Sequence, residues 1–373
     1  MGRRARLKVV RQLKTPGRDL VVVGAGIVGL ACAWRASQAG ASVLVLERGQ
    51  PGAQASAAAA GMLAPVTEAA FGEEELLRLN LAGRAEWSGF AAELSERSGI
   101  DLEYRESGAL VVAADRDDVA ELRRLNELQR SLGLDARWLT GRDCRRLEAG
   151  LSPRVGGGVL APQDASVDPR AVVRALVRAL ADAGVQVRTG VEVSAIDEAH
   201  GRVRGVATSS GPVAAERVLV AAGPWSAELH PDAPRVRPVK GQILRLRGAP
   251  LAERIVRTPR CYVVSRGSGE VVVGATVEER GFDTTVTAGA VHRLLEAAWE
   301  VLPDVEEREL VETTAALRPA LPGNLPIVGP AGPDGVLWAT GHHRGGVLLA
   351  PLAATTVAQL VAGSAAPVAG SAA

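Results

Sequence analysis

The chain has 373 residues, of which 47% are hydrophobic and 23% are charged, and its formal net charge is +1. This length and balance are typical of a globular protein with two domains, and a charge near zero gives no reason to expect a nucleic-acid partner. The three cysteines, Cys32, Cys144 and Cys261, are too few and too scattered for a disulfide framework or a metal site. A reducing cytoplasm without a structural metal is therefore the expected setting.

The first 18 residues hold seven Arg or Lys and no acid, which predicts a disordered basic extension. Arg3 and Arg4 are paired as in a twin-arginine export signal, but Arg11 and Lys14 interrupt the segment before an apolar region can form. No run of 18 apolar residues occurs further along the chain, so no membrane span is expected.

Residues 19–49 carry the most informative motif. An apolar run at 20–23 leads into a G-x-G-x-x-G turn at Gly24, Gly26 and Gly29, and an amphipathic segment then leads to a second apolar run. In such a turn the glycines permit a tight bend, close backbone approach to a pyrophosphate, and close packing of helix on strand. The pattern predicts a Rossmann-like β-α-β unit with its phosphate site at the helix N-terminus.

Glu47 ends the second apolar run, 18 residues after Gly29. A carboxylate at this place accepts hydrogen bonds from ribose hydroxyls and would repel a 2′-phosphate. The cofactor is therefore expected to be FAD or NAD rather than NADP. The competing interpretation is a tight turn followed by a solvated strand end.

The next elements alternate between helix and strand. A small-residue segment at 50–66 precedes amphipathic helices at 73–98 and 116–132, which flank a short strand at 109–113. A helix at 171–183 follows Pro169, and alternating strands then end in R-V-L-V-A-A-G-P-W-S at 217–226. The small residues there suit either a close ligand or a plain buried strand with a Gly-Pro turn.

The remaining elements are mostly strands and no longer alternate with helices. Strands between 236 and 278, a helix at 288–301 and a strand at 308–317 predict a mixed, largely antiparallel sheet. We therefore expect an α/β protein with a Rossmann-like domain and an interleaved α+β substrate domain. The predicted parts are a basic extension (1–18), a discontinuous cofactor domain (19–91, 152–226 and 321–364), a substrate domain (92–151 and 227–320) and a disordered tail (365–373).

Motifs in one order along residues 19–365 carry a family resemblance. They are the glycine turn, A-G-M-L-A-P (60–65), D-A-S-V-D-P-R (164–170), V-A-A-G-P-W-S (220–226), R-P-V-K-G-Q (237–242), C-Y-V-V-S-R (261–266), L-R-P (317–319), L-P-I-V-G (325–329) and A-T-G-H-H-R-G-G-V-L-L-A-P (339–351). In this order the chain resembles the D-amino-acid oxidase family of flavoproteins, and within it the glycine oxidase branch associated with thiamine thiazole synthesis.

The resemblance implies noncovalent FAD and a small amino-acid substrate. The substrate α-hydrogen would pass as hydride to flavin N5, and O2 would reoxidise the flavin to give an imine and H2O2. For glycine the imine could supply thiazole synthase, or water could hydrolyse it to glyoxylate and ammonia. Sarcosine and small D-amino acids are lesser expected substrates, and the family tends to form homotetramers.

The resemblance also assigns the substrate residues. Arg318 would bind the carboxylate through a bidentate fork, Tyr262 would donate a further hydrogen bond, and Arg344 would make a secondary contact at the mouth of the site. The alternatives are a surface arginine at 318 or 344 and a tyrosine at 262 that only packs. No acid–base pair is required if the amine arrives unprotonated.

The expected cofactor contacts come from six segments. His342 and His343 are assigned to a cofactor-facing loop rather than to general-base catalysis, and a helix beginning near Gly346 would direct its positive end to the flavin. Met62 would line the pocket or pack in the core, and Lys240 is expected to be structural. The predicted cofactor residues are Gly24, Gly26, Ile27, Val28, Gly29, Glu47, Arg48, Ser56, Ala60, Gly61, Met62, Val193, Ala222, Gly223, Trp225, His342, His343, Arg344, Gly345, Gly346, Val347 and Leu348.

Four positions depart from the family pattern. His343 and Gly345 change the loop beside the ring, Gly323 replaces an acid, and Arg260 stands where a neutral residue or histidine is common. These changes bear on substrate preference more than on cofactor identity.

Three other functions remain open on the sequence. They are a D-amino-acid dehydrogenase that passes electrons to a quinone or carrier, a flavin-binding subunit without turnover, and an NAD-dependent dehydrogenase.

Overall fold

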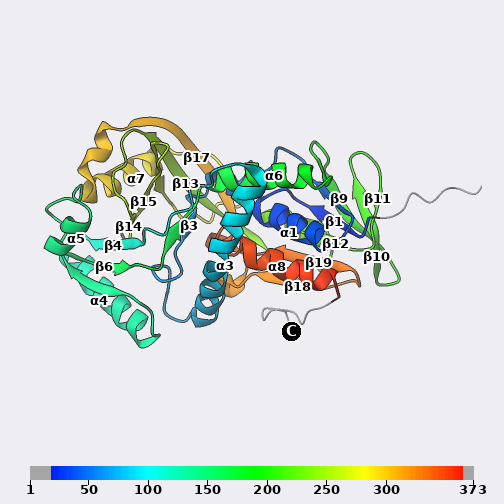
Figure 1. The fold of residues 1–373 in the computed structure, drawn as a ribbon, viewed down its shortest axis with the longest axis horizontal. Coiled ribbons are helices and arrows are strands. Elements are labelled where there is room, and N and C mark those ends of the chain that lie inside the picture. The colour runs from blue at the N-terminus through cyan, green and yellow to red at the C-terminus, as the bar shows by residue number, and fades with distance from the viewer. Residues whose placement is uncertain (1–17, 364–373) are drawn as a thin grey trace, which may run out of the picture.

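The computed structural model describes residues 18–363 and has two lobes side by side along its longest axis (Figure 1). The predicted basic extension, apart from Arg18, and the predicted tail lie outside the described residues. Among the residues that are described, no helix has the length and apolar character needed to cross a membrane.

The first lobe is built on a six-stranded sheet in the order β18-β19-β12-β1-β2-β8. Every neighbouring pair is parallel except β18 with β19, so the sheet is Rossmann-like with one antiparallel edge strand. Its strands are β1 (Leu20–Val23), β2 (Val43–Leu46), β8 (Gln186–Arg188), β12 (Val218–Val220), β18 (Ile327–Pro330) and β19 (Val336–Thr340).

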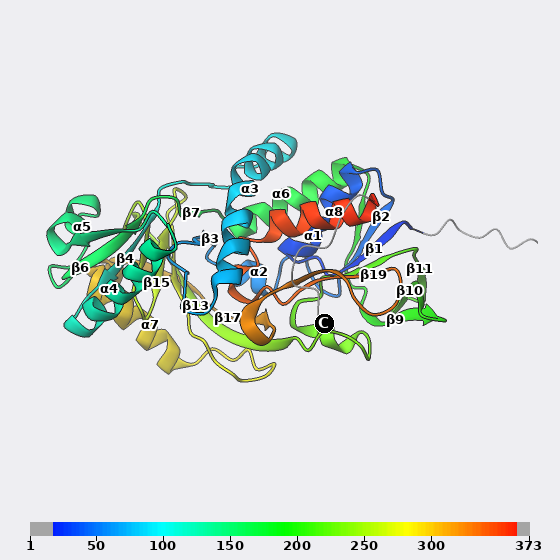
Figure 2. The ribbon, with the colours of Figure 1, turned by 90° about the horizontal axis from the view of Figure 1, so that it is seen from below.

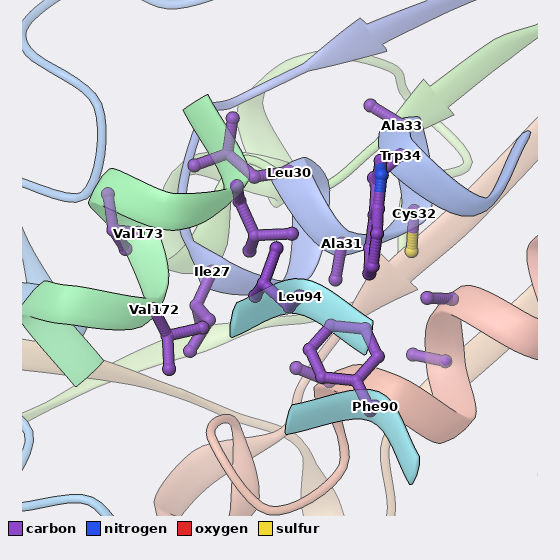
Figure 3. Close-up of a cluster of buried hydrophobic side chains, with 14 of the residues drawn as sticks. Ile27, Leu30, Ala31, Cys32, Ala33, Trp34, Phe90, Leu94, Val172 and Val173 are labelled. Atoms are coloured by element: carbon purple, nitrogen blue, oxygen red, sulfur yellow. The ribbon is translucent and has the colours of Figure 1, made fainter. Parts of the chain in front are cut away.

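Helices cover one face of this sheet (Figure 2). Alternate strand residues such as Leu20 and Val22 enter one core with these helices, where Trp34 and Phe90 meet edge to face at 5.4 Å between ring centroids (Figure 3). Val21 and Val23 point to the other face, which a small three-stranded sheet covers. The elements are α1 (Ile27–Gln38), α3 (Glu74–Ser98), α6 (Pro169–Asp182) and α8 (Ala350–Val361), with β9 (Val193–Ala199), β10 (Arg202–Thr208) and β11 (Val213–Ala214) opposite.

The second lobe contains an eight-stranded sheet in the order β17-β13-β16-β15-β14-β4-β6-β5. Only the β14–β4 pair is parallel, which confirms the predicted mixed, largely antiparallel sheet. The elements are β4 (Ala109–Ala113), α4 (Arg116–Ser131), β5 (Arg137–Thr140), α5 (Gly141–Leu147), β6 (Gly157–Ala161), β13 (Arg237–Arg247), β14 (Ile255–Arg257), β15 (Tyr262–Ser265), β16 (Glu270–Gly274), α7 (Ala288–Val301) and β17 (Glu309–Ala320).

Short elements join the lobes. The strands β3 (Met62–Leu63) and β7 (Ala165–Ser166) pair with each other just after α2 (Ala55–Ala58). Four 3₁₀ turns complete the described residues: Gly223–Glu228, Pro303–Glu307, Pro322–Asn324 and His343–Gly345.

The structure moves two of the predicted boundaries. The predicted division at residue 91 falls inside α3, and Leu94 and Leu102 lie in the core of the first lobe. The predicted division at residue 152 would place β6 with the cofactor domain, but β6 pairs with β4 and β5 in the second lobe. The helix predicted near Gly346 begins at Ala350, and the 3₁₀ turn His343–Gly345 comes before it.

Candidate active site

The glycine turn lies where the strand order of the first lobe reverses, between β1 and β12. Ligands of open α/β sheets bind at this switch point because the loops at the carboxyl ends of the two strands leave in opposite directions. Gly24 has a φ of +103°, and a Cβ there would lie 2.5 Å from the Ala221 carbonyl oxygen. The turn and the end of β12 are therefore packed backbone against backbone.

The helix α1 leaves this turn without a side-chain cap from its N-cap residue. Its N-cap is Gly26, which has no side chain to cap the helix, while the Ile27 N–H donates to Ser56 Oγ at 3.0 Å. Gly26, Ile27 and Ser56 all line the same cavity. The positive end of α1 thus points at the space where a pyrophosphate would bind.

Glu47 lies beside the turn at the end of β2. Its carboxylate accepts hydrogen bonds from the Ala25 and Gly49 amides, both at 2.8 Å. Next to it, the Arg48 guanidinium stacks 3.8 Å above the Trp225 ring. Because two backbone amides fix the carboxylate, it is held at the edge of the cavity, where it can accept hydrogen bonds from the hydroxyls of a ribose.

One cavity of ≈ 600 Å³ extends from this turn into the second lobe. It is lined by Arg318, Tyr262 and all the predicted cofactor residues except three, Gly29, Gly345 and Leu348. Gly29 acts through packing instead, and Leu348 is a core residue whose carbonyl accepts a hydrogen bond from Trp87 Nε1. Of the four predicted loop contacts at 345–348, Gly346 and Val347 line the cavity, whereas Gly345 and Leu348 do not.

The residues of this cavity fit FAD. Within the part of the chain that the structure describes, the buried Nε2 of His342 and Nδ1 of His343 have no hydrogen-bond partner. Both histidines line the cavity, as do the glycine turn and Arg318. Orphaned polar atoms of this kind call for a ligand with polar edges, which a flavin ring supplies.

Arg318 and Tyr262 lie on one face of the second sheet, and glycines make room for both. A Cβ at Gly241 would lie 2.4 Å from Arg318 Nη1, and a Cβ at Gly274 would lie 2.4 Å from the Tyr262 hydroxyl oxygen. The Arg318 Nη1 also donates to the Thr276 carbonyl at 3.1 Å. The Arg318 guanidinium thus packs over Gly241 and the Tyr262 hydroxyl over Gly274, which fixes both groups at the cavity wall.

Burial raises the pKa of the Tyr262 phenol, and the nearby Arg318 charge opposes this shift. The phenol therefore stays protonated and can donate a hydrogen bond to a carboxylate. Together Arg318 and Tyr262 offer a planar cation and a neutral donor to the same small anion.

Three further charged residues lie at this end of the cavity. Glu68 and Arg257 were not predicted, and Arg344 was predicted as a secondary substrate contact. Glu68 and Arg257 line the cavity, and the Arg257 Nη1 lies 3.4 Å from Glu68 Oε1. Arg344 lies 3.5 Å from Glu68 and also pairs with Glu73, so much of its charge is balanced by protein carboxylates. No local sequence signal marks Glu68 or Arg257.

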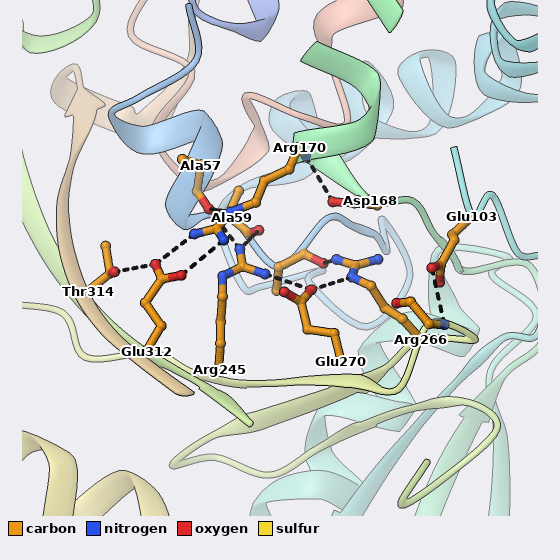
Figure 4. Close-up of polar contacts among 12 residues, drawn as sticks. Ala57, Ala59, Glu103, Asp168, Arg170, Arg245, Arg266, Glu270, Glu312 and Thr314 are labelled. Carbon is orange, nitrogen blue, oxygen red and sulfur yellow. Dashed lines mark hydrogen bonds and ion pairs between the residues drawn. The ribbon is translucent and has the colours of Figure 1, made fainter. Parts of the chain in front are cut away.

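A partly buried ionic cluster lies on the same sheet face (Figure 4). Arg170 pairs with Glu312 at 2.7 Å, while Arg245 and Arg266 share Glu270 at 2.7 and 2.9 Å. The three arginines donate to carbonyl oxygens of the small-residue segment, and the residues involved are Ala57, Ala59 and Ala60. The cluster thus holds the backbone of a segment whose residues 58–62 line the cavity.

Burial lowers the pKa of His342 to about 4. Between about pH 6.5 and pH 4 the unfolded chain binds a proton at this histidine and the folded chain does not. Stability from this group is therefore complete above about pH 6.5 and is lost as the pH falls toward 4.

We expect His342→Leu to flatten the acid side of the stability profile. The slope removed is at most about 1.4 kcal/mol per pH unit, since one proton is involved. Urea unfolding at pH 7 and pH 5 measures it, with His200→Asn as the control because His200 is exposed. Equal pH dependence in wild type and His342→Leu would show that His342 titrates normally in the folded protein.

Comparison with known proteins identifies the family. A family model described as FAD dependent oxidoreductase matches residues 19–360. Glycine oxidase of Geobacillus kaustophilus is 34% identical over 352 residues, and the match covers 92% of each chain. The crystal structure of glycine oxidase from Geobacillus kaustophilus matches with a TM-score of 0.88 and 33% identity, covering 94% of this chain and 95% of that one.

A longer relative matches over part of its length. The bifunctional protein ThiO/ThiG of Trichormus variabilis is 34% identical over 351 residues, which are 92% of this chain and 52% of that protein. The chain thus spans about half the length of that curated relative. With a family match that extends from the glycine turn to α8, the chain belongs to the FAD dependent oxidoreductases, in the group of amino-acid oxidases that includes glycine oxidase.

Proposed function

We propose that this protein oxidises glycine to its imine and, less efficiently, sarcosine and small D-amino acids. When bound, FAD would accept the hydride from the substrate α-carbon and give the electron pair to O2, so one amine is oxidised for each H2O2 formed. The imine would be released and hydrolysed to glyoxylate and ammonia, or used by a thiazole synthase.

The observation that carries this proposal is the position of Arg318 and Tyr262 in the cavity that begins at the Rossmann turn. A small amino acid has few groups besides its carboxylate by which it can be held. A fixed guanidinium with a phenol donor binds that carboxylate in one orientation, which presents the α-carbon to the rest of the cavity. The substrate carboxylate would be held at the Arg318 end of the cavity, and the cofactor would extend from the Rossmann turn toward it. Hydride transfer needs the substrate α-carbon and the cofactor to meet in this way.

Residues of the cavity would also determine the charge state in which the substrate binds. His342 is neutral at physiological pH because of its low pKa, so it adds no positive charge next to the amine. The protein offers Arg318 for the carboxylate and leaves the amine to bind unprotonated. No step then requires a general base.

We further propose noncovalent FAD, a cytoplasmic setting and a homotetramer. Cys261 lines the cavity, but burial raises the pKa of its thiol to about 11, so the thiolate needed for attachment does not form at neutral pH. The proposed cytoplasmic setting rests on the small number of cysteines, and the proposed homotetramer rests on the family resemblance.

Anaerobic mixing with glycine is expected to bleach the yellow absorbance of the purified protein. In air, without an added acceptor, one H2O2 should form per glycine consumed. Glycinamide is the matched control, because it keeps the amine and α-carbon but lacks the carboxylate that Arg318 binds.

Bleaching without peroxide would instead support a dehydrogenase that passes electrons to a quinone or other carrier. A protein whose flavin no amino acid bleaches would contradict the proposal and favour a binding subunit.

A further inference from the structure

Five neighbouring strands form one wall of the cavity. In the order β17, β13, β16, β15 and β14 they place Arg318, Gly241, Gly274, Tyr262 and Arg257 along the sheet. The register pairs Arg257 with Tyr262 and Tyr262 with Gly274, and directly paired residues share a face with about 5 Å between Cβ atoms. Arg257 therefore stands beside Tyr262, on the side away from Arg318.

Arg257 faces the cavity with most of its donors unused. Its Nη1 donates to Thr67 Oγ1 at a long 3.3 Å, and the 3.4 Å approach to Glu68 is an ion pair without a hydrogen bond. A guanidinium has five N–H donors. No other partner for them occurs among residues 18–363.

Glu68 gives Arg257 a charge partner but accepts no hydrogen bond from it. The same carboxylate lies 3.5 Å from Arg344, so two guanidinium groups share it. Glu68 is one-tenth exposed and Arg257 about one-fifth, so neither charge is well screened by water. A second anionic group in the cavity would complete the hydrogen bonds of Arg257.

We propose that Arg257 forms a subsite for a second carboxylate, so that a small amino acid with two carboxylates is a better substrate than its analogue with one. One carboxylate binds Arg318 and Tyr262 as in the proposed function, on which this inference rests. The other carboxylate binds Arg257 on the far side of Tyr262. The chemistry is unchanged: the α-hydrogen leaves as hydride, and O2 takes the electron pair to form H2O2.

The kinetic test compares substrates that differ by one carboxylate. Iminodiacetate should exceed sarcosine, and D-aspartate should exceed D-alanine, by at least about 10-fold in kcat/KM, since a charged, hydrogen-bonded contact contributes about 1.5–3 kcal/mol. In Arg257→Leu the iminodiacetate-to-sarcosine ratio should fall by about the same factor, and Arg257→Lys should restore part of it. Arg137→Leu on β5 is the control, because Arg137 is exposed and pairs with Asp135 outside the cavity.

A binding test works even if no substrate is turned over. Malonate and succinate should perturb the flavin absorbance at concentrations at least about 10-fold lower than acetate does, and Arg257→Leu should remove that advantage. Variants are compared only after their flavin spectra show a loaded, folded protein.

The outcomes separate the two proposals. If glycine bleaches the flavin but the dicarboxylates have no advantage, or if Arg257→Leu leaves the ratios unchanged, the subsite is excluded and the oxidase function stands. If no amino acid bleaches the flavin, the oxidase function fails, and the malonate titration alone decides whether Arg257 binds a carboxylate.

Discussion

Arg318→Ala is expected to lower kcat/KM for glycine by roughly 30- to 1000-fold, mainly through a higher KM. The substitution leaves the substrate carboxylate without its cation in a partly closed cavity, and losing a charged partner of this kind costs about 2–4 kcal/mol. Tyr262 remains as a single donor and cannot replace the bidentate contact. Steady-state peroxide formation measures the effect.

The structure supplies matched controls for this variant. Arg318→Lys keeps the charge but not the fork, so it should recover only part of the loss. Arg247→Ala removes an exposed arginine from the neighbouring strand β13 and should leave kcat/KM unchanged. A KM in Arg318→Ala equal to that of wild type would remove Arg318 from the substrate site.

Gly29→Ala is expected to abolish stable flavin binding. A Cβ at this position would lie 2.1 Å from the Gly24 carbonyl oxygen and 3.2 Å from the Ala221 side chain. Backbone cannot move aside as a flexible side chain can, so α1 must shift away from the switch point. Overpacking of this kind typically costs about 1–3 kcal/mol, more than the gain of at most about 1 kcal/mol from alanine in a helix.

The measurement is the ratio of flavin to protein absorbance after purification, together with the melting temperature with and without added FAD. Gly89→Ala is the control, since Gly89 is also a helical glycine and a Cβ there meets nothing within 4 Å. That control should keep its flavin and melt at the same or a slightly higher temperature. A Gly29→Ala protein that retains full flavin would show that α1 does not need its close approach to β1.

The sequence was most informative where the function depends on neighbours in the chain. The glycine turn and Glu47 lie within one β-α-β unit, so their spacing alone predicts a Rossmann turn and a carboxylate at the adjacent strand end. Arg318 and Tyr262 were identified only through the family resemblance, because a lone arginine or tyrosine in a strand carries no local signal. The start of α8 was misplaced because small residues from 345 onward suit either a 3₁₀ turn or a helix.

What the sequence by itself determined is the dinucleotide fold and its cofactor class, both of which depend on contacts within about 30 residues. Only the tertiary structure decided which side chains share the substrate end. Gly241, Gly274 and Arg257 meet there through strand register between segments far apart in the chain, and Glu68 joins them from a different element. A one-residue change of strand register would turn Arg257 or Tyr262 to the opposite face of the sheet, and the linear sequence does not fix that register.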